Sequence, residues 1–162
     1  MNITIDYIDS PIGEITVGVT DKGLHLLSFD KKEFDNSIYQ QEKGKHKTIE
    51  GLKIQLQEYF LKERTAFDIP LDLRGTPFQI SVWNELLNIE FGKTRTYKEQ
   101  ALALNNLKAI RAVAAANGAN PIPIVIPCHR VVGSDGSLTG FSGGLWRKKF
   151  LLALESDQTL LF

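Results

Sequence analysis

The first third of the chain alternates apolar and polar residues with the two-residue period of half-buried β-strands. Turn-forming residues at 10–13 and 21–23 interrupt this alternation. The apolar positions fall into three runs: Ile3, Ile5 and Tyr7; Ile15, Val17 and Val19; Leu24 and Leu26. The pattern predicts a small antiparallel sheet at the start of the chain.

The residues after this sheet predict a connection, a helix and a last strand. Residues 31–47 are mostly polar, which predicts an exposed connection. Apolar residues then recur at helical spacing from Ile49 to Phe60, so a helix should pack on the sheet. Alternation returns at Phe67, Ile69 and Leu71 and predicts a final strand. Residues 73–75 would link this part to a second unit.

The second half begins with strong helix signals. Thr76 is followed by Pro77 and Gln79, which is the pattern of a capping box with proline at the first helical position. The predicted buried stripe of this helix is Val82, Trp83, Leu86 and Leu87. A second capping pattern, Thr96 with Glu99, opens a short helix to about residue 104, and another short helix follows over about 107–117. Two short helices joined by a tight turn are typical of a helix-turn-helix.

Beyond Gly118 the chain becomes extended. The prolines at 121 and 123 exclude a helix there, and residues 124–126 predict a buried strand that leads into Cys128 and His129. A loop rich in Gly and Ser follows over 133–144, and residues 145–155 predict a last helix. Trp83 and Trp146 are both interpreted as core or near-core residues.

Composition fits a globular protein of one or two domains. The chain has 162 residues, of which 43% are hydrophobic and 23% charged. No apolar run approaches the roughly 20 residues of a membrane helix, and the start lacks the features of a signal peptide. We therefore expect a cytoplasmic protein without membrane contact.

The cysteine content and the charge distribution limit the kinds of site that the chain can form. The single Cys excludes an internal disulfide and a multi-cysteine zinc site, and the three His show no metal-ligand spacing, so no metal or cofactor is expected. The formal net charge is zero, but residues 1–75 hold 10 basic and 13 acidic residues, whereas residues 76–162 hold 9 and 6. This basic surplus, located between residues 93 and 149, is compatible with one face that meets phosphates.

The dipeptide Cys128-His129 is a candidate nucleophile and base. A thiolate is the reactive form of Cys, and a nearby imidazole oriented by a carboxylate raises its population. Neighbouring side chains on a strand point to opposite faces, so contact between the two requires a turn or a bridging water. Taken alone the dipeptide leaves open an inert buried thiol or a Cys-His hydrolase, although no Gly-rich oxyanion loop supports the latter.

The longer string over residues 122–132, Ile-Pro-Ile-Val-Ile-Pro-Cys-His-Arg-Val-Val, resembles the active-site signature of the O6-alkylguanine-DNA alkyltransferases. The resemblance covers essentially all of residues 76–162. It implies an α/β (α+β) protein with a ribonuclease H-like domain over 1–75 and a helical domain over 76–162. The helical domain would carry the active site and a helix-turn-helix of winged-helix type.

The same resemblance implies roles for individual residues. Cys128 would accept the alkyl group, His129 would take its proton through a water, and Glu155 would orient His129. Asn120 would brace the turn that carries Cys128, and Tyr97 would help to rotate the nucleotide and donate to the departing guanine. The predicted DNA contacts are Arg111, Ala112, Ala115, Tyr97 and Arg130. The predicted pocket residues are Val131, Phe141, Ser142 and Trp83.

The resemblance implies irreversible repair of O6-methylguanine, and also of O4-methylthymine, in double-stranded DNA bound through its minor groove. Chemistry supports a single turnover, because a thioether is stable and the chain has no second thiol. The residues Ala109, Ala112 and Ala116, with Ala115 beside them, would give a helix face small enough for shallow entry into a groove about 6 Å wide. We expect a monomer. A non-catalytic module that only binds alkylated guanine is the alternative.

Overall fold

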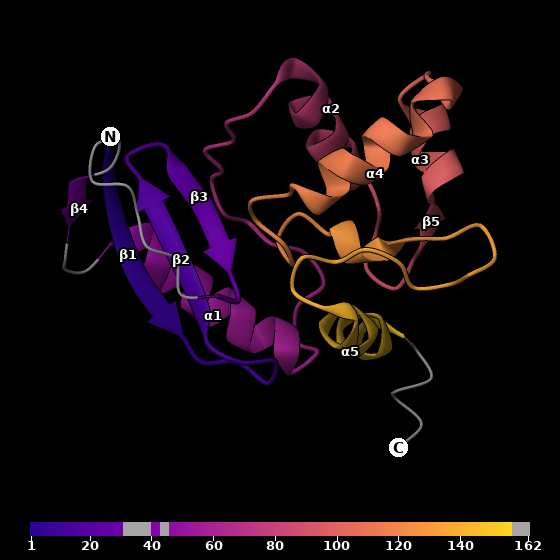
Figure 1. Ribbon diagram of the computed structural model, residues 1–162. Helices are drawn as coiled ribbons and strands as arrows, with labels where there is room; N and C mark the ends of the chain where they lie inside the picture. Colours follow the sequence, from indigo (N-terminus) through magenta and orange to yellow (C-terminus); the bar gives the residue numbers. More distant parts are fainter. Residues whose placement is uncertain (31–39, 43–45, 157–162) are drawn as a thin grey trace. The chain divides into compact units, whose positions relative to one another are not determined.

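The computed structural model describes residues 1–30, 40–42 and 46–156 (Figure 1). The chain divides into two compact units, Met1–Arg74 and Gly75–Phe162.

The first unit contains a four-stranded sheet. Its strands are β1 (Asn2–Ile8), β2 (Ile15–Thr20), β3 (Gly23–Ser28) and β4 (Gln40–Glu42), in the order β3-β2-β1-β4. The pairs β1–β2 and β2–β3 are antiparallel, as predicted, and β4 adds to β1 in parallel. β4 lies inside the segment 31–47, for which an exposed connection was expected and no strand was predicted. Residues 31–39 and 43–45 of the same segment lie outside the described part of the chain.

Helix α1 (Lys47–Phe60) packs on β2 and β3 of this sheet. Its first turn is capped by His46, whose Nδ1 accepts a hydrogen bond from the Thr48 amide at 3.2 Å. The helix buries four apolar side chains at the predicted spacing: Ile49, Leu52, Leu56 and Tyr59.

The strand predicted at residues 67–71 does not form. Only one isolated bridge, Leu24 to Leu71, joins this segment to β3. The Leu24 amide donates to the Pro70 carbonyl and the Asp72 amide donates to the Leu24 carbonyl, both at 2.8 Å, but Pro70 has no amide hydrogen with which to extend the ladder. Gly23 allows this close approach, because a Cβ there would collide with the Pro70 carbonyl.

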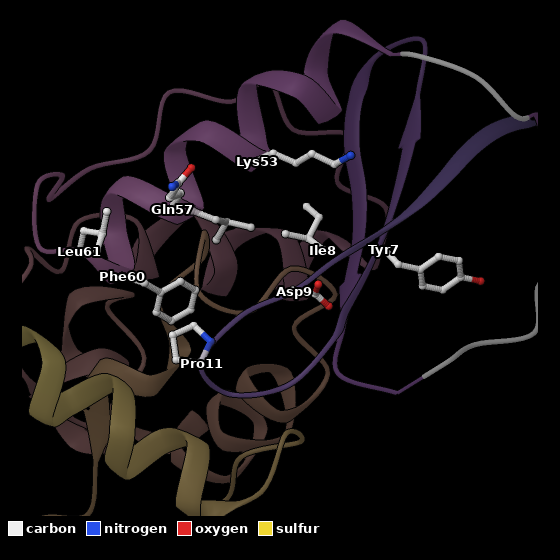
Figure 2. Close-up of a pocket in the computed structure, with 9 residues that line it drawn as sticks. Tyr7, Ile8, Asp9, Pro11, Lys53, Gln57, Phe60 and Leu61 are labelled. Carbon is white, nitrogen blue, oxygen red and sulfur yellow. The ribbon is translucent and has the colours of Figure 1, made fainter.

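A groove of about 470 Å³ lies in the first unit between the end of β1 and α1 (Figure 2). Apolar side chains such as Ile8 and Phe60 line it together with polar ones such as Asp9 and Gln57. Lys53 also lines the groove and forms an ion pair with Asp6 at 2.8 Å. None of the lining residues is among the predicted site residues.

The second unit is mainly helical, with α2 (Pro77–Leu86), α3 (Tyr97–Ala103), α4 (Ile110–Gly118) and α5 (Leu145–Glu155). Both predicted capping boxes are present. Thr76 caps α2 together with Gln79, and Thr96 caps α3 together with Glu99.

Helices α3 and α4 pack on each other and form the predicted helix-turn-helix. Asn105 sits in the turn with a φ of 56°, a left-handed conformation that Asn tolerates better than most residues. The second helix starts later than predicted, because residues Leu107–Ala109 form a separate 3₁₀ turn, η1.

A short parallel pair of strands, not predicted from the sequence, completes the second unit. β5 (Arg95–Thr96) pairs with β6 (Val131–Val132), with Thr96 opposite Val132. The pairing holds the start of α3 beside the segment that follows Cys128.

Candidate active site

Cys128 lies on a tight turn, and not at the end of a strand as the sequence suggested. Residues 124–125 form a turn in which Ile124 has a φ of 74°, a conformation that is rare for a β-branched residue. At Pro127 the backbone (φ −82°, ψ 62°) makes an inverse γ-turn, closed by the Cys128 amide on the Ile126 carbonyl at 2.8 Å. Cys128–Arg130 then form the 3₁₀ turn η2. The apolar run 124–126 is buried as predicted, but it is not extended.

Asn120 holds this turn in place with its side chain. Its Nδ2 donates to the Ile126 carbonyl at 2.8 Å, and its Oδ1 accepts from the Ile122 amide at 3.0 Å. Both bonds are buried and replace partners that a strand would have provided. Asn120 therefore has the geometry of the brace that was expected of it.

The Cys128 thiol is protonated in this environment. Its side chain is buried, with 7% of the residue exposed. Burial raises the pKa of the Cys128 thiol to about 11, although a hydrogen bond with Asn120 and the positive charge of Lys148 oppose the rise. A nucleophile in this position needs a base to remove its proton.

His129 is arranged as such a base. Its Nε2 lies 2.7 Å from Oε2 of Glu155, and both side chains are buried. Because the carboxylate can only accept, Nε2 is assigned the proton, and Nδ1 keeps a lone pair. Burial lowers the pKa of His129 despite the bond to Glu155, so the imidazole is neutral at physiological pH. Nδ1 is buried and has no hydrogen-bond partner among the residues that the structure describes.

Arg130 does not lie on a DNA-binding surface, which corrects the sequence prediction. It is 6% exposed, and its guanidinium donates to both oxygens of Glu155, at 2.7 and 3.0 Å, and to the Ile89 carbonyl. A guanidinium enclosed by these acceptors cannot also bind a phosphate. The flanking apolar string was a signal for this, because a charged residue among buried neighbours requires an internal partner.

Glu155 therefore accepts hydrogen bonds from both His129 and Arg130. Burial alone would raise the pKa of Glu155, but hydrogen bonds from His129 and Arg130 outweigh it and lower that pKa to about 2. The ionised carboxylate anchors α5 to the turn that bears Cys128.

Lys148 is a site residue that the sequence analysis missed. It is fully buried on α5, and its Nζ donates to the carbonyls of Val131 at 2.6 Å and Thr139 at 2.8 Å. The Tyr97 hydroxyl donates to the same Thr139 carbonyl at 3.2 Å. Burial lowers the pKa of Lys148, and the nearby Cys128 opposes this. Lys148 therefore ties the loop after β6 to the neighbourhood of Cys128 and Tyr97.

The predicted pocket residues differ in their surroundings. Val131 is buried beside the Cys128 turn, whereas Phe141 and Ser142 lie on the loop 133–144, Phe141 half-buried and Ser142 exposed. Trp83 lies in the core of the helical unit, where its Nε1 donates to the Ala116 carbonyl at 2.8 Å. Trp146 was interpreted as core or near-core, but it is 56% exposed, so that interpretation is wrong.

Helix α4 presents a surface of small residues, although not the one predicted. Arg111, Ala112 and Ala115 are exposed, as a DNA-contacting face requires. Ala116 is buried against α2, so it does not belong to this face. The exposed small positions of the helix are Ala112, Ala114, Ala115 and Gly118.

The basic surplus of the second unit is also smaller at the surface than the sequence suggested. Arg130 and Lys148 are buried, and Arg95 forms an ion pair with Glu85 at 3.0 Å. The exposed basic residues are Lys93, Lys98, Lys108, Arg111 and Lys149.

Within the described residues, no cluster of three or more His, Cys, Asp or Glu side chains could hold a metal ion. No helix in the same part of the chain is long and apolar enough to cross a membrane.

Each of the two units matches a known protein family model. The family described as "6-O-methylguanine DNA methyltransferase, ribonuclease-like domain" matches residues 3–73, and its "DNA binding domain" matches residues 77–157. The methylated-DNA–protein-cysteine methyltransferase of Methanosarcina barkeri is 46% identical over 152 residues, which cover 94% of this chain and 96% of that protein.

Solved structures agree with the sequence matches. Mycobacterium tuberculosis OGT in complex with DNA aligns with a TM-score of 0.85 at 44% identity, covering 94% of this chain and 92% of the other. Mycobacterium tuberculosis O6-methylguanine methyltransferase aligns with a TM-score of 0.84 at 42% identity, covering 99% of each chain. These matches confirm the α/β fold class and the resemblance stated from the motif. The chain belongs to the 6-O-methylguanine DNA methyltransferase family.

Proposed function

We propose that this protein repairs DNA by moving the alkyl group of O6-methylguanine, once and irreversibly, to the sulfur of its own Cys128. One arrangement carries the proposal: a buried thiol is followed in the chain by a neutral imidazole, and a buried carboxylate holds the far nitrogen of that imidazole. The relatives named as methylated-DNA–protein-cysteine methyltransferases support the same chemistry.

The proton of Cys128 would leave first. The lone pair on Nδ1 of His129 would accept it through a bridging water, and Glu155 would stabilise the imidazolium that forms. The thiolate would then attack the alkyl carbon, forming a C–S bond while the bond from that carbon to O6 breaks. The electron pair of the broken bond passes to the guanine.

The departing guanine needs a proton donor. We assign this role to the Tyr97 hydroxyl, which in the structure donates to the Thr139 carbonyl and would turn to the base when it is bound. Val131, Phe141 and Ser142 would surround the base, and Lys148 would keep the Thr139 end of their loop in place. The product is a thioether, so the protein is consumed in the reaction.

Helix α4 is the proposed contact to DNA through the minor groove. Ala112 and Ala115 would lie against the groove, and the exposed Arg111 would enter the base stack in place of the extruded nucleotide. Arg130 is not among the proposed DNA contacts, because it is buried.

Replacing Arg111 by Ala should slow repair of duplex DNA at least about tenfold, because extrusion of the base costs a few kcal/mol that the Arg side chain offsets. Reaction with free O6-benzylguanine should change little, since a free base needs no extrusion. Single-turnover rates with the two substrates measure the difference. Lys108→Ala, another exposed basic residue near α4, is the matched control. Equal losses with both substrates would contradict the role of Arg111.

We further propose that one chain acts alone in the cytoplasm, with domains at 1–75 and 76–162. Every residue assigned to the reaction comes from the second unit, so a monomer carries the complete site.

Transfer of a radiolabelled methyl group from DNA tests the proposal. The expected result is one label per protein molecule, no further turnover, and no transfer by Cys128→Ser. Repeated turnover would point to a true catalyst. Binding of O6-methylguanine DNA without transfer by the intact protein would favour the alternative, a module that only recognises the lesion.

A further inference from the structure

Three buried side-chain atoms in the described residues lack a hydrogen-bond partner: Nδ1 of His129, and both Nδ2 and Oδ1 of Asn117. The mechanism above gives a role to the first and none to the other two. A buried polar group without a partner is costly, and in a native structure it requires a specific explanation. Asn117 is therefore the unexplained polar group of this unit.

Asn117 lies one turn of α4 before Asn120, the residue whose side chain reaches Cys128. It is 6% exposed, on the same inner side of the helix as the buried Val113 and Ala116. The Asn120 amide donates to the Asn117 carbonyl at 3.2 Å, so the backbone still turns helically between them. Residues three apart on such a turn have neighbouring side chains, and the side chain of Asn120 hydrogen bonds with Cys128.

The other hydrogen-bond donors near Cys128 already have acceptors, and the side chain of Asn120 is shared between the Ile126 carbonyl and Cys128. Nδ2 of Asn120 donates to the Ile126 carbonyl, and Lys148 donates to two carbonyls. The Asn117 amide is the one whose N–H groups have no acceptor in the described structure. A neutral thiol is a poor acceptor, whereas a thiolate is a charged one that attracts N–H donors strongly.

We propose that Asn117 is a further catalytic residue, whose side-chain amide donates to the Cys128 sulfur when it becomes a thiolate. The donor is unpaired before the proton leaves and gains its partner as negative charge appears on Sγ. An interaction made only after that charge develops lowers the barrier, in the manner of an oxyanion hole. The inference deepens the proposed function and rests on Cys128 as its nucleophile.

The sole cysteine makes the test direct, because the rate of reaction with iodoacetamide, followed across pH, reports the Cys128 thiolate alone. Asn117→Leu removes the two N–H donors and keeps a side chain of similar size. We expect it to raise the pKa of Cys128 by about one unit and to slow the iodoacetamide reaction at neutral pH about tenfold. The melting temperature should stay the same or rise, because an unpaired buried amide is lost.

Two further variants make the outcome decisive. Asn117→Asp keeps the shape but replaces the donors with a carboxyl group, so it should raise the Cys128 pKa at least as much. Asn106→Leu makes the same change at an exposed position and should leave the pKa unchanged. The variants leave in place the other titratable and charged groups around Cys128, which are His129, Arg130, Lys148 and Glu155.

An unchanged thiol pKa in Asn117→Leu and Asn117→Asp would overturn the inference. A lower melting temperature without a pKa change would also overturn it, since the amide would then have a structural partner. These measurements use neither DNA nor alkylguanine. A shifted thiol pKa in a protein that fails to accept methyl groups from DNA would therefore contradict the proposed function and leave the role of Asn117 standing.

Discussion

Replacing Glu155 by Ala should lower the free energy of unfolding by about 3–5 kcal/mol, because it leaves the buried guanidinium of Arg130 without its carboxylate. Glu155 is 2% exposed and accepts two bonds from Arg130 and one from His129. Loss of one member of a buried ion pair costs far more than loss of a surface pair. Urea denaturation followed by circular dichroism measures the change.

Glu85→Ala is the matched control for this effect. Glu85 also pairs with an arginine, Arg95, at 3.0 Å, but both side chains remain about one-fifth exposed. Its removal should cost at most about 1 kcal/mol. Similar losses in the two variants would show that the network around Glu155 does not support the fold as described.

Replacing His129 by Gln should slow methyl transfer by about 10²- to 10⁴-fold at neutral pH, the usual contribution of a general base. The Cys128 thiol, with a pKa of about 11, is almost wholly protonated at neutral pH without help. Single-turnover rates with duplex O6-methylguanine, measured across pH, test this. The deficit should shrink as the pH rises toward the pKa of Cys128, because hydroxide then supplies the thiolate.

The stability of the protein at acidic pH follows from the lowered pKa of His129. Burial lowers the pKa of His129 below its ordinary 6.5, so the folded protein binds this proton less readily than the unfolded chain. Stability that depends on neutral His129 is therefore lost as the pH falls through 6.5 toward the folded pKa. Glu155, whose pKa drops from 4.5 to about 2, adds a second loss of stability over that lower pH range.

For the rate of methyl transfer, a deficit of His129→Gln that is the same at every pH would contradict the role of His129 as the base.

The regular elements of this protein could be predicted because local signals decide them. Capping boxes at Thr76 and Thr96 set the starts of α2 and α3, and apolar spacing set α1 and α5. The segment around Cys128 escaped prediction because its conformation depends on side-chain hydrogen bonds of Asn120, which the apolar pattern does not reveal. The run Ile124–Val125–Ile126 has strand propensity, but the two side-chain bonds of Asn120 hold it in a turn.

The partners of charged residues were also beyond local patterns. Arg130 was assigned to a DNA contact, yet its partner is Glu155, which is 25 residues away. Lys148 sits between two other basic residues on α5, and only the tertiary structure shows that it alone of the three is buried, with its Nζ donating to two carbonyls. In both cases the pairing forms only when the helical unit folds.

Peptide mass mapping of the spent protein tests the central claim most directly. After incubation with duplex DNA carrying O6-methylguanine, the peptide that contains Cys128 should gain the mass of one methyl group in place of a hydrogen, in step with the guanine restored. An unmodified Cys128 peptide, or the added mass on any other residue, would contradict the account.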